Sequence, residues 1–308
     1  MKKIIVVAGP TAVGKTKYAI EIAKAFDGEI VSCDSMQLYK YMNIGSAKPT
    51  AEECAEVRHH LVDEIDPKEP FSVAKYAKLA KAAIQDIFSR GKMPVISGGT
   101  GLYLNSLLYD MDFSNAPKDD ELRANLEKEA ELFGSEYLHK KLAELDPAAA
   151  ERIHPNNLKK LIRALEGAES GNNITNFKNC NIKCEDYETI LIGLTRNRDE
   201  LYDRINRRVD IMVEEGLFAE VEELLEMGLA EEDISMKGIG YKEIIGCFDG
   251  MYGKDEAIEL IKKNSRHLAK RQLTWFRRYE DMKWFNISEY SGDDEAIGEI
   301  KTWLRNKI

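Results

Sequence analysis

A glycine-rich segment near the start of the sequence has the residue types that bind a polyphosphate. Two glycines flank four residues and precede a lysine and a threonine, in the order Gly9-Pro10-Thr11-Ala12-Val13-Gly14-Lys15-Thr16. Glycines permit backbone conformations that direct successive amides into one concavity, and a helix after them adds the positive end of its dipole. We expect Lys15 to bridge phosphate oxygens and the Thr16 hydroxyl to ligate Mg²⁺.

The segment does not reveal which polyphosphate it binds. An NTPase usually has an acidic residue at the end of a second apolar strand, where it holds the metal. Here the apolar run 94–97 is followed by Gly98-Gly99-Thr100-Gly101, and Asp63 after Leu61 and Val62 is a weak substitute. ATP hydrolysis is therefore not the favoured reaction. A small-molecule or nucleoside kinase and a nucleotide-dependent switch remain alternatives.

Asp34 is the acidic residue best placed to act beside this segment. It follows the apolar run Glu29–Cys33, and ligands of parallel α/β sheets lie outside the carboxyl ends of the strands. Asp34 could cap a turn together with Ser35, bind magnesium in its outer sphere, or serve as a general base. Its position alone leaves these three roles open.

Residues 3–97 alternate apolar runs with amphipathic segments, which predicts a parallel sheet with helices on its faces. We expect strands at Lys3–Ala8, Glu29–Cys33, His59–Ile65 and Pro94–Ser97, and helices at Lys15–Phe26 and Val73–Arg90. The fold class is therefore α/β.

The pattern changes after about residue 112. Four helices are expected with no strand between them, at Glu121–Phe133, Glu136–Glu144, Pro147–Ile153 and Asn156–Ser170. The apolar run Thr189–Leu194 predicts a return to the sheet, and Lys283–Ile287 a last short strand. We predict a P-loop NTPase-like core of residues 1–112 and 189–308, and an all-helical insertion of residues 113–188.

The composition is that of a globular protein without a membrane span. The chain has 308 residues, of which 44% are hydrophobic, and 44 Lys and Arg against 54 Asp and Glu give a net charge of −10. Apolar runs such as Ile4–Ala8 are far shorter than the roughly 20 residues that cross a bilayer. We expect a cytoplasmic protein. The acidic total by itself argues against a nucleic-acid partner.

Local basic clusters qualify that conclusion. Seven Lys and Arg and no acidic residue lie between Lys262 and Arg278, and positions 263, 266, 270, 274 and 277 share one face of a helix. Such a run is usually a solvated face, but the absence of a compensating acid favours contact with a phosphate backbone. Lys159, Lys160 and Arg163 form a second cluster in the predicted insertion.

Several motifs together resemble the tRNA dimethylallyltransferase (isopentenyltransferase) family. In the predicted core they are residues 9–16, Asp34-Ser35-Met36-Gln37-Leu38-Tyr39, Asn43-Ile44-Gly45-Ser46-Ala47-Lys48-Pro49 and Gly98-Gly99-Thr100-Gly101-Leu102-Tyr103. The likeness continues through Ile153-His154-Pro155-Asn156-Asn157, Gly238-Ile239-Gly240-Tyr241 and Lys270-Arg271-Gln272-Leu273-Thr274-Trp275. The C-terminal zinc finger of eukaryotic members is absent, so the sequence resembles the bacterial form.

The resemblance implies transfer of a dimethylallyl group from its diphosphate to N6 of adenosine 37, next to the anticodon, in tRNAs that read codons beginning with U. It implies Asp34 as general base, with Thr100 and Arg208 also in the catalytic site, residues 9–16 on the diphosphate, and Mg²⁺ at Thr16. The tRNA contacts that it implies, on the anticodon stem-loop, are Asp34, Ser35, Met36, Gln37, Thr100, Arg123, Lys159, Lys160, Leu161, Ile162, Arg163, Lys270 and Arg271. A monomer without a membrane partner is expected.

Overall fold

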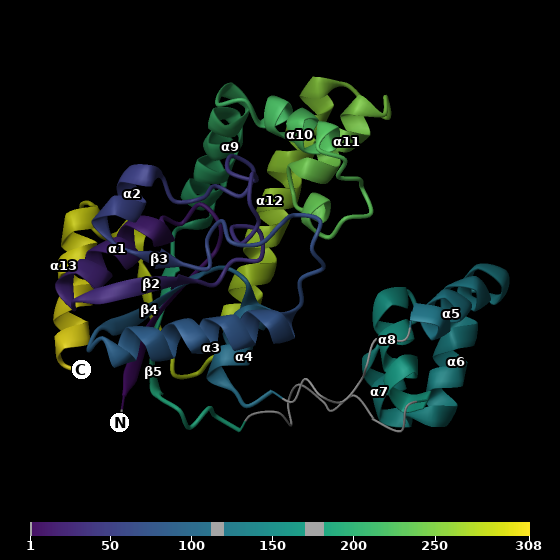
Figure 1. Cartoon of the computed structure of the whole chain (residues 1–308), viewed down its shortest axis with the longest axis horizontal. Coiled ribbons are helices and arrows are strands. Elements are labelled where there is room, and N and C mark those ends of the chain that lie inside the picture. Colours follow the sequence, from purple (N-terminus) through teal and green to yellow (C-terminus); the bar gives the residue numbers. More distant parts are fainter. Residues whose placement is uncertain (1, 112–119, 170–181) are drawn as a thin grey trace. The chain divides into compact units, whose positions relative to one another are not determined.

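The larger part of the chain is built on a parallel sheet (Figure 1). The computed structural model describes residues 2–111, 120–169 and 182–308. Its strands within these residues are β1 (Lys3–Ala8), β2 (Gly28–Ser32), β3 (His59–His60), β4 (Met93–Gly98), β5 (Glu188–Thr195) and β6 (Lys283–Asn286). They lie in the order β3-β2-β4-β1-β5-β6, and every neighbouring pair is parallel. The predicted α/β fold is confirmed.

Helices cover both faces of this sheet. They are α1 (Lys15–Ala25), α2 (Ala51–Glu56), α3 (Val73–Ser89), α4 (Gly101–Leu108), α9 (Arg198–Glu214), α10 (Leu217–Glu226), α11 (Tyr241–Phe248), α12 (Lys254–Phe276) and α13 (Asp293–Arg305), with 3-10 turns η1 (Ser235–Lys237) and η2 (Ile287–Glu289). Ile5 and Val7 share a core with α1 and α13, and that core includes no residue of α3. Since α3 contacts β2 and β4, it covers the opposite face, toward which alternate residues of a strand point.

A second compact unit interrupts the first. Residues 1–108 and 185–308 form one unit, here called the sheet unit, and residues 109–184 form the helical unit. The sequence-based division places both boundaries four residues later. The helical unit contains α5 (Asp120–Phe133), α6 (Ser135–Leu145), α7 (Pro147–Arg152) and α8 (Leu158–Glu169). It has its own apolar core, which includes Leu126, Leu138, Leu142, Leu161 and Leu165.

The strand predicted at His59–Ile65 is mostly wrong. Only His59 and His60 pair with β2, because Leu61 and Asp63 have φ of 60° and leave the extended region. The segment instead lies along residues 37–40, where Gln37 and Leu38 carbonyls accept from the Asp63 and Ile65 amides at 2.9 Å each. This loop holds the chain that follows Asp34 against the sheet. Within the described residues, none of the helices is both long and apolar enough to cross a membrane.

Candidate active site

The loop between β1 and α1 has the backbone shape of an anion cradle. Gly14 precedes α1 with φ of 108°, and Ala12 has φ of 63°. Both values lie in the left-handed region, which costs a residue with a Cβ about 1–2 kcal/mol. The amides after this turn begin α1, and their free N–H groups together with the helix dipole favour a bound anion. The loop therefore has the backbone conformation expected of a polyphosphate-binding loop.

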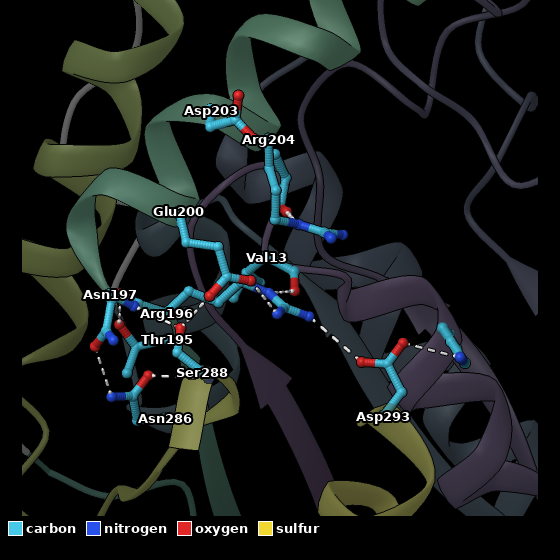
Figure 2. A network of polar contacts seen from close by, with 12 residues as sticks. Val13, Thr195, Arg196, Asn197, Glu200, Asp203, Arg204, Asn286, Ser288 and Asp293 are labelled. Atoms are coloured by element: carbon cyan, nitrogen blue, oxygen red, sulfur yellow. Dashed lines mark hydrogen bonds and ion pairs between the residues drawn. The ribbon is translucent and has the colours of Figure 1, made fainter. Parts of the chain in front are cut away.

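Arginines from far along the chain bind the carbonyl groups of this loop (Figure 2). Arg204 on α9 donates from Nε to the Ala12 carbonyl at 3.0 Å. Arg196, just before α9, donates from Nε to the Val13 carbonyl at 3.1 Å. Arg196 also bridges to Glu200 at 2.6 Å and to Asp293 at 3.4 Å. The C-terminal half of the sheet unit thus holds the loop through two of its carbonyl groups.

Cations converge on the inner side of the loop. Lys15 Nζ donates to the Pro10 carbonyl at 2.9 Å, and Arg208 Nη1 lies 3.5 Å from the Thr11 hydroxyl. Burial lowers the pKa of the Lys15 ammonium to about 8, an effect that Asp34 opposes and Arg208 reinforces. Burial also lowers the pKa of Arg208 from its usual value. These groups line a polar cavity of about 490 Å³, which also contains Gly14, Thr16, Arg204 and Arg207 in its walls.

Asp34 lies just beyond the carboxyl end of β2, as predicted. Its Oδ1 accepts from the Met36 amide at 2.9 Å and from the Gln37 amide at 3.4 Å. The carboxylate therefore caps a tight turn, one of the three roles that the sequence left open. It also lines the polar cavity, so the turn fixes its direction without withdrawing it from the site.

Thr100 ties this turn to the loop after β4. Its hydroxyl accepts from the Ser35 amide at 3.0 Å, and its own amide donates to the Cys33 carbonyl at 3.1 Å. Thr100 lines a second cavity with Ser35 and Met36. The structure therefore brings Thr100, Asp34 and the phosphate loop together, while Gln37 lines the polar cavity.

The second cavity is apolar and adjoins the polar one. Its volume is about 420 Å³, and Thr11, Asp34, Arg208 and Gln272 are in the walls of both. The apolar part of its wall comes mainly from α9, α12 and the segment between them, through Ile205, Val209, Met212, Leu217, Ile239, Ile261, Leu268 and Trp275. Asp34 thus stands where a cation-lined cavity meets an apolar one.

Gln272 completes the site, although the sequence analysis gave it no role of its own. Its Oε1 accepts from the Thr11 amide at 2.8 Å, and its Nε2 donates to the Gly99 carbonyl at 3.0 Å. A Cβ on Gly99 would lie 2.3 Å from that Nε2, so a larger residue at position 99 would displace the Gln272 amide from this position. The signal for it in the sequence is its place in the motif Lys270–Trp275, which carries part of the family resemblance.

Glu220 is the second residue without a predicted role. It is 8% exposed and accepts from the amides of Asn43 and Ile44 at 2.7 Å each and of Gly45 at 3.0 Å. The Tyr241 hydroxyl donates to it at 2.8 Å. The carboxylate thereby holds the loop whose Gly45 and Ser46 line the apolar cavity. The sequence did contain a signal that Glu220 is buried, because it lies on the same helical face as the apolar residues Leu217, Val221 and Leu224.

The basic run on α12 is divided between internal pairs and an exposed surface. Lys262 pairs with Asp210 at 2.8 Å, and Arg266 donates to Asn206 of α9, so the prediction of an uncompensated run is wrong at its beginning. Lys270 and Arg271 are exposed and line a shallow basic groove with His267, Thr274, Trp275 and Arg278.

The structure of the helical unit changes the interpretation of some residues that were predicted to contact tRNA. Arg123 and Arg163 bind the same fully buried Glu166, at 2.8 Å and 2.5 Å. Leu161 is fully buried in the apolar core, so its side chain is not a surface contact, whereas Ile162 belongs to that core and also lines the groove described below. Lys159 and Lys160 are exposed. Arg123, Lys159 and Arg163 line a groove of this unit.

Comparisons with known proteins identify the family of this chain. A sequence model of the family described as IPP transferase matches residues 37–279. Curated proteins named tRNA dimethylallyltransferase are 52% identical in Alkaliphilus metalliredigens, over 96% of both chains, and 50% identical in Clostridioides difficile, over 100% of both.

Solved structures similar to this chain indicate the same family. The tRNA isopentenylpyrophosphate transferase of Bacillus halodurans is 44% identical with a TM-score of 0.76, covering 100% of this chain and 97% of that one. A eukaryotic dimethylallyltransferase acting on tRNA is 26% identical with a TM-score of 0.81, covering 99% and 80%. This chain therefore belongs to the IPP transferase family.

Proposed function

We propose that this protein transfers the dimethylallyl group of dimethylallyl diphosphate to N6 of adenosine 37 in tRNAs that read codons beginning with U. One observation carries the proposal: Asp34 stands where the cation-lined cavity meets the apolar cavity. A diphosphate with a short apolar group matches that pairing of charge and hydrophobicity. The identity to curated tRNA dimethylallyltransferases along nearly the whole chain supports the same activity.

The phosphate loop would bind the leaving group. In the reaction the allylic carbon–oxygen bond breaks, and its electron pair leaves with the diphosphate. The loop amides, Lys15 and Arg208 are placed to stabilise the growing negative charge. No hydrolytic water has to be positioned, which fits the absence of an acidic residue directly after β4.

Asp34 would accept the proton of the nucleophile. The adenine amino group is a weak nucleophile because its lone pair is delocalised into the ring. As N6 bonds to the allylic carbon, it must lose a proton, and a carboxylate that takes it accelerates the step by about 10² to 10⁴. The turn that fixes Asp34, and Thr100 which binds that turn, would aim the carboxylate at the extruded base.

The donor set of the polar cavity suits magnesium. Thr16 lines it, and its hydroxyl oxygen is the ligand type that Mg²⁺ prefers, while this ion commonly takes its other ligands from phosphates and water. Within the described residues no cluster of three His, Cys, Asp or Glu offers an all-protein site. Thr16 would hold the ion, which when bound would neutralise charge on the leaving diphosphate.

The substrate test compares two donors. The protein is incubated with unmodified tRNA, Mg²⁺ and either allyl-labelled dimethylallyl diphosphate or γ-labelled ATP. We expect label in RNA only from the prenyl donor, located on N6 of adenosine 37 after digestion to nucleosides. A tRNA with guanosine at position 37 is the control. Label entering RNA only from ATP would instead establish the kinase alternative.

Diphosphate affinity is expected to depend on the titration of Lys15. Its pKa is about 8 without ligand, and a bound anion raises it, so the complex holds the proton more tightly than the free protein. Affinity is therefore complete below about pH 8 and decreases as the pH rises through that value. The measurement is the Kd for inorganic pyrophosphate in wild type and in Lys15→Arg, whose guanidinium stays charged. The affinity of wild type divided by that of Lys15→Arg should fall as the pH rises from about 7 to 9.5, because only the lysine loses its charge. A constant ratio would contradict the role of the Lys15 ammonium in binding the diphosphate.

The exposed groove on α12 would contact the tRNA backbone. We expect Lys270→Ala to raise the KM for tRNA about three- to tenfold and to reduce the salt dependence of tRNA binding by roughly one unit of slope. The affinity for dimethylallyl diphosphate should stay unchanged. Lys78→Ala removes the same charge from an exposed position on α3 and is the matched control. An equal loss for both substrates would argue against RNA contact at Lys270.

A further inference from the structure

We propose that Arg204 is a positioning residue for the diphosphate, acting through the backbone of Ala12. This inference rests on the proposed function, because it assumes that the loop binds a diphosphate. Arg204 would hold Ala12 in the left-handed conformation that the loop requires.

The first step of the argument is conformational. Ala12 has φ of 63°, a value that favours glycine, yet the sequence has a Cβ here. An alanine keeps such a conformation only where surrounding contacts enforce it. The Arg204 bond to the Ala12 carbonyl, at 3.0 Å, is a contact of that kind.

The second step concerns the direction of the amides. A trans peptide points its carbonyl and the following N–H in opposite directions. Arg204 on the Ala12 carbonyl and Arg196 on the Val13 carbonyl therefore turn the Val13 and Gly14 amides away from the two guanidinium groups. The Val13 amide, opposite the carbonyl that Arg204 binds, donates to the Pro10 carbonyl at 3.4 Å. Arg204 therefore acts on the cavity by fixing the Ala12 conformation, from which the chain continues to Gly14 in the cavity wall.

The third step is the rigidity of the support (Figure 2). Asp293, at the start of α13, accepts from Arg196 at 3.4 Å. It also accepts from Lys17 at 2.9 Å and from Tyr18 at 2.7 Å, and both residues belong to the helix that follows the loop. Arg196, α1 and α13 are thus joined in one polar network, which fixes the Val13 carbonyl next to the peptide that Arg204 binds.

The experiment measures inorganic pyrophosphate binding by calorimetry in the presence of Mg²⁺. Arg204→Met should weaken binding about five- to thirtyfold, the range expected from the intrinsic cost of a left-handed alanine. Adding Ala12→Gly should restore the affinity to within about threefold of wild type, because glycine adopts this conformation without support. Arg198→Met removes an exposed arginine of the same helix and should leave the affinity unchanged.

Each outcome supports or overturns a stated proposal. No weakening in Arg204→Met overturns the proposal, and so does weakening that Ala12→Gly does not rescue, which would indicate direct contact between Arg204 and the ligand. If Arg204→Met does not fold, Arg204→Lys is measured with and without Ala12→Gly: a rescued loss supports the proposal, and an unrescued loss or none overturns it. If wild type itself does not bind pyrophosphate, the proposed function fails instead.

Discussion

Asp34→Asn is expected to lower turnover at least a hundredfold while leaving the affinity for inorganic pyrophosphate within about threefold of wild type. Asparagine retains the Oδ1 that accepts from the Met36 and Gln37 amides, so the turn stays formed. What it loses is the ability to take a proton. The loss should therefore appear in single-turnover prenyl transfer and not in binding.

The control for this prediction is Asp199→Asn, which makes the same change in the exposed first turn of α9. The magnesium alternative makes a different prediction. If Asp34 holds the metal rather than the proton, the affinity for pyrophosphate in the presence of Mg²⁺ should fall together with turnover. A parallel loss of both would reject the general base.

Glu220→Ala is expected to lower the free energy of unfolding by about 3–5 kcal/mol. The substitution leaves three backbone amides and the Tyr241 hydroxyl without their acceptor. Bonds to a charged group contribute about 1.5–3 kcal/mol each, and unpartnered buried donors incur their desolvation cost. Urea denaturation monitored by circular dichroism measures the change.

Glu222→Ala on the same helix is the matched control. Glu222 is exposed, and we expect a change within about 0.5 kcal/mol. Tyr241→Phe removes only one of the four donors and should have an intermediate effect. A loss below about 1 kcal/mol for Glu220→Ala would mean that the loop 43–45 finds other partners and that the carboxylate does not position it.

Strands and helices with strong local patterns were predictable from the sequence. The strands β1, β4 and β5 contain apolar runs, because both faces of a parallel sheet are covered, and β2 contributes the shorter pair Ile30 and Val31. Helix α4 was not predicted, since residues 103–108 are all buried and leave no polar face to reveal a period of 3.6. Strand β3 ends early because of backbone conformations at Leu61 and Asp63 that no apolar pattern encodes.

The site was predictable where its chemistry is local. The phosphate loop and Asp34 are each recognisable from a few adjacent residues. Gln272 and Arg204 were not, because their partners Thr11 and Ala12 lie 261 and 192 residues away. The same reason applies to Arg123 in the helical unit, which pairs with Glu166 of another helix 43 residues away. The pairing of Arg163 with Glu166 is local, because the two residues lie three apart on α8.

The distance along the chain between the loop and its supports has a consequence during synthesis on the ribosome. The loop emerges early, but Arg196 and Arg204 follow 183 and 192 residues after the carbonyls that they bind, and Gln272 later still. A nascent chain therefore exposes an unsupported cradle until α12 leaves the exit tunnel. The cradle of an unfinished copy would thus lack the contacts that fix its shape in the complete protein.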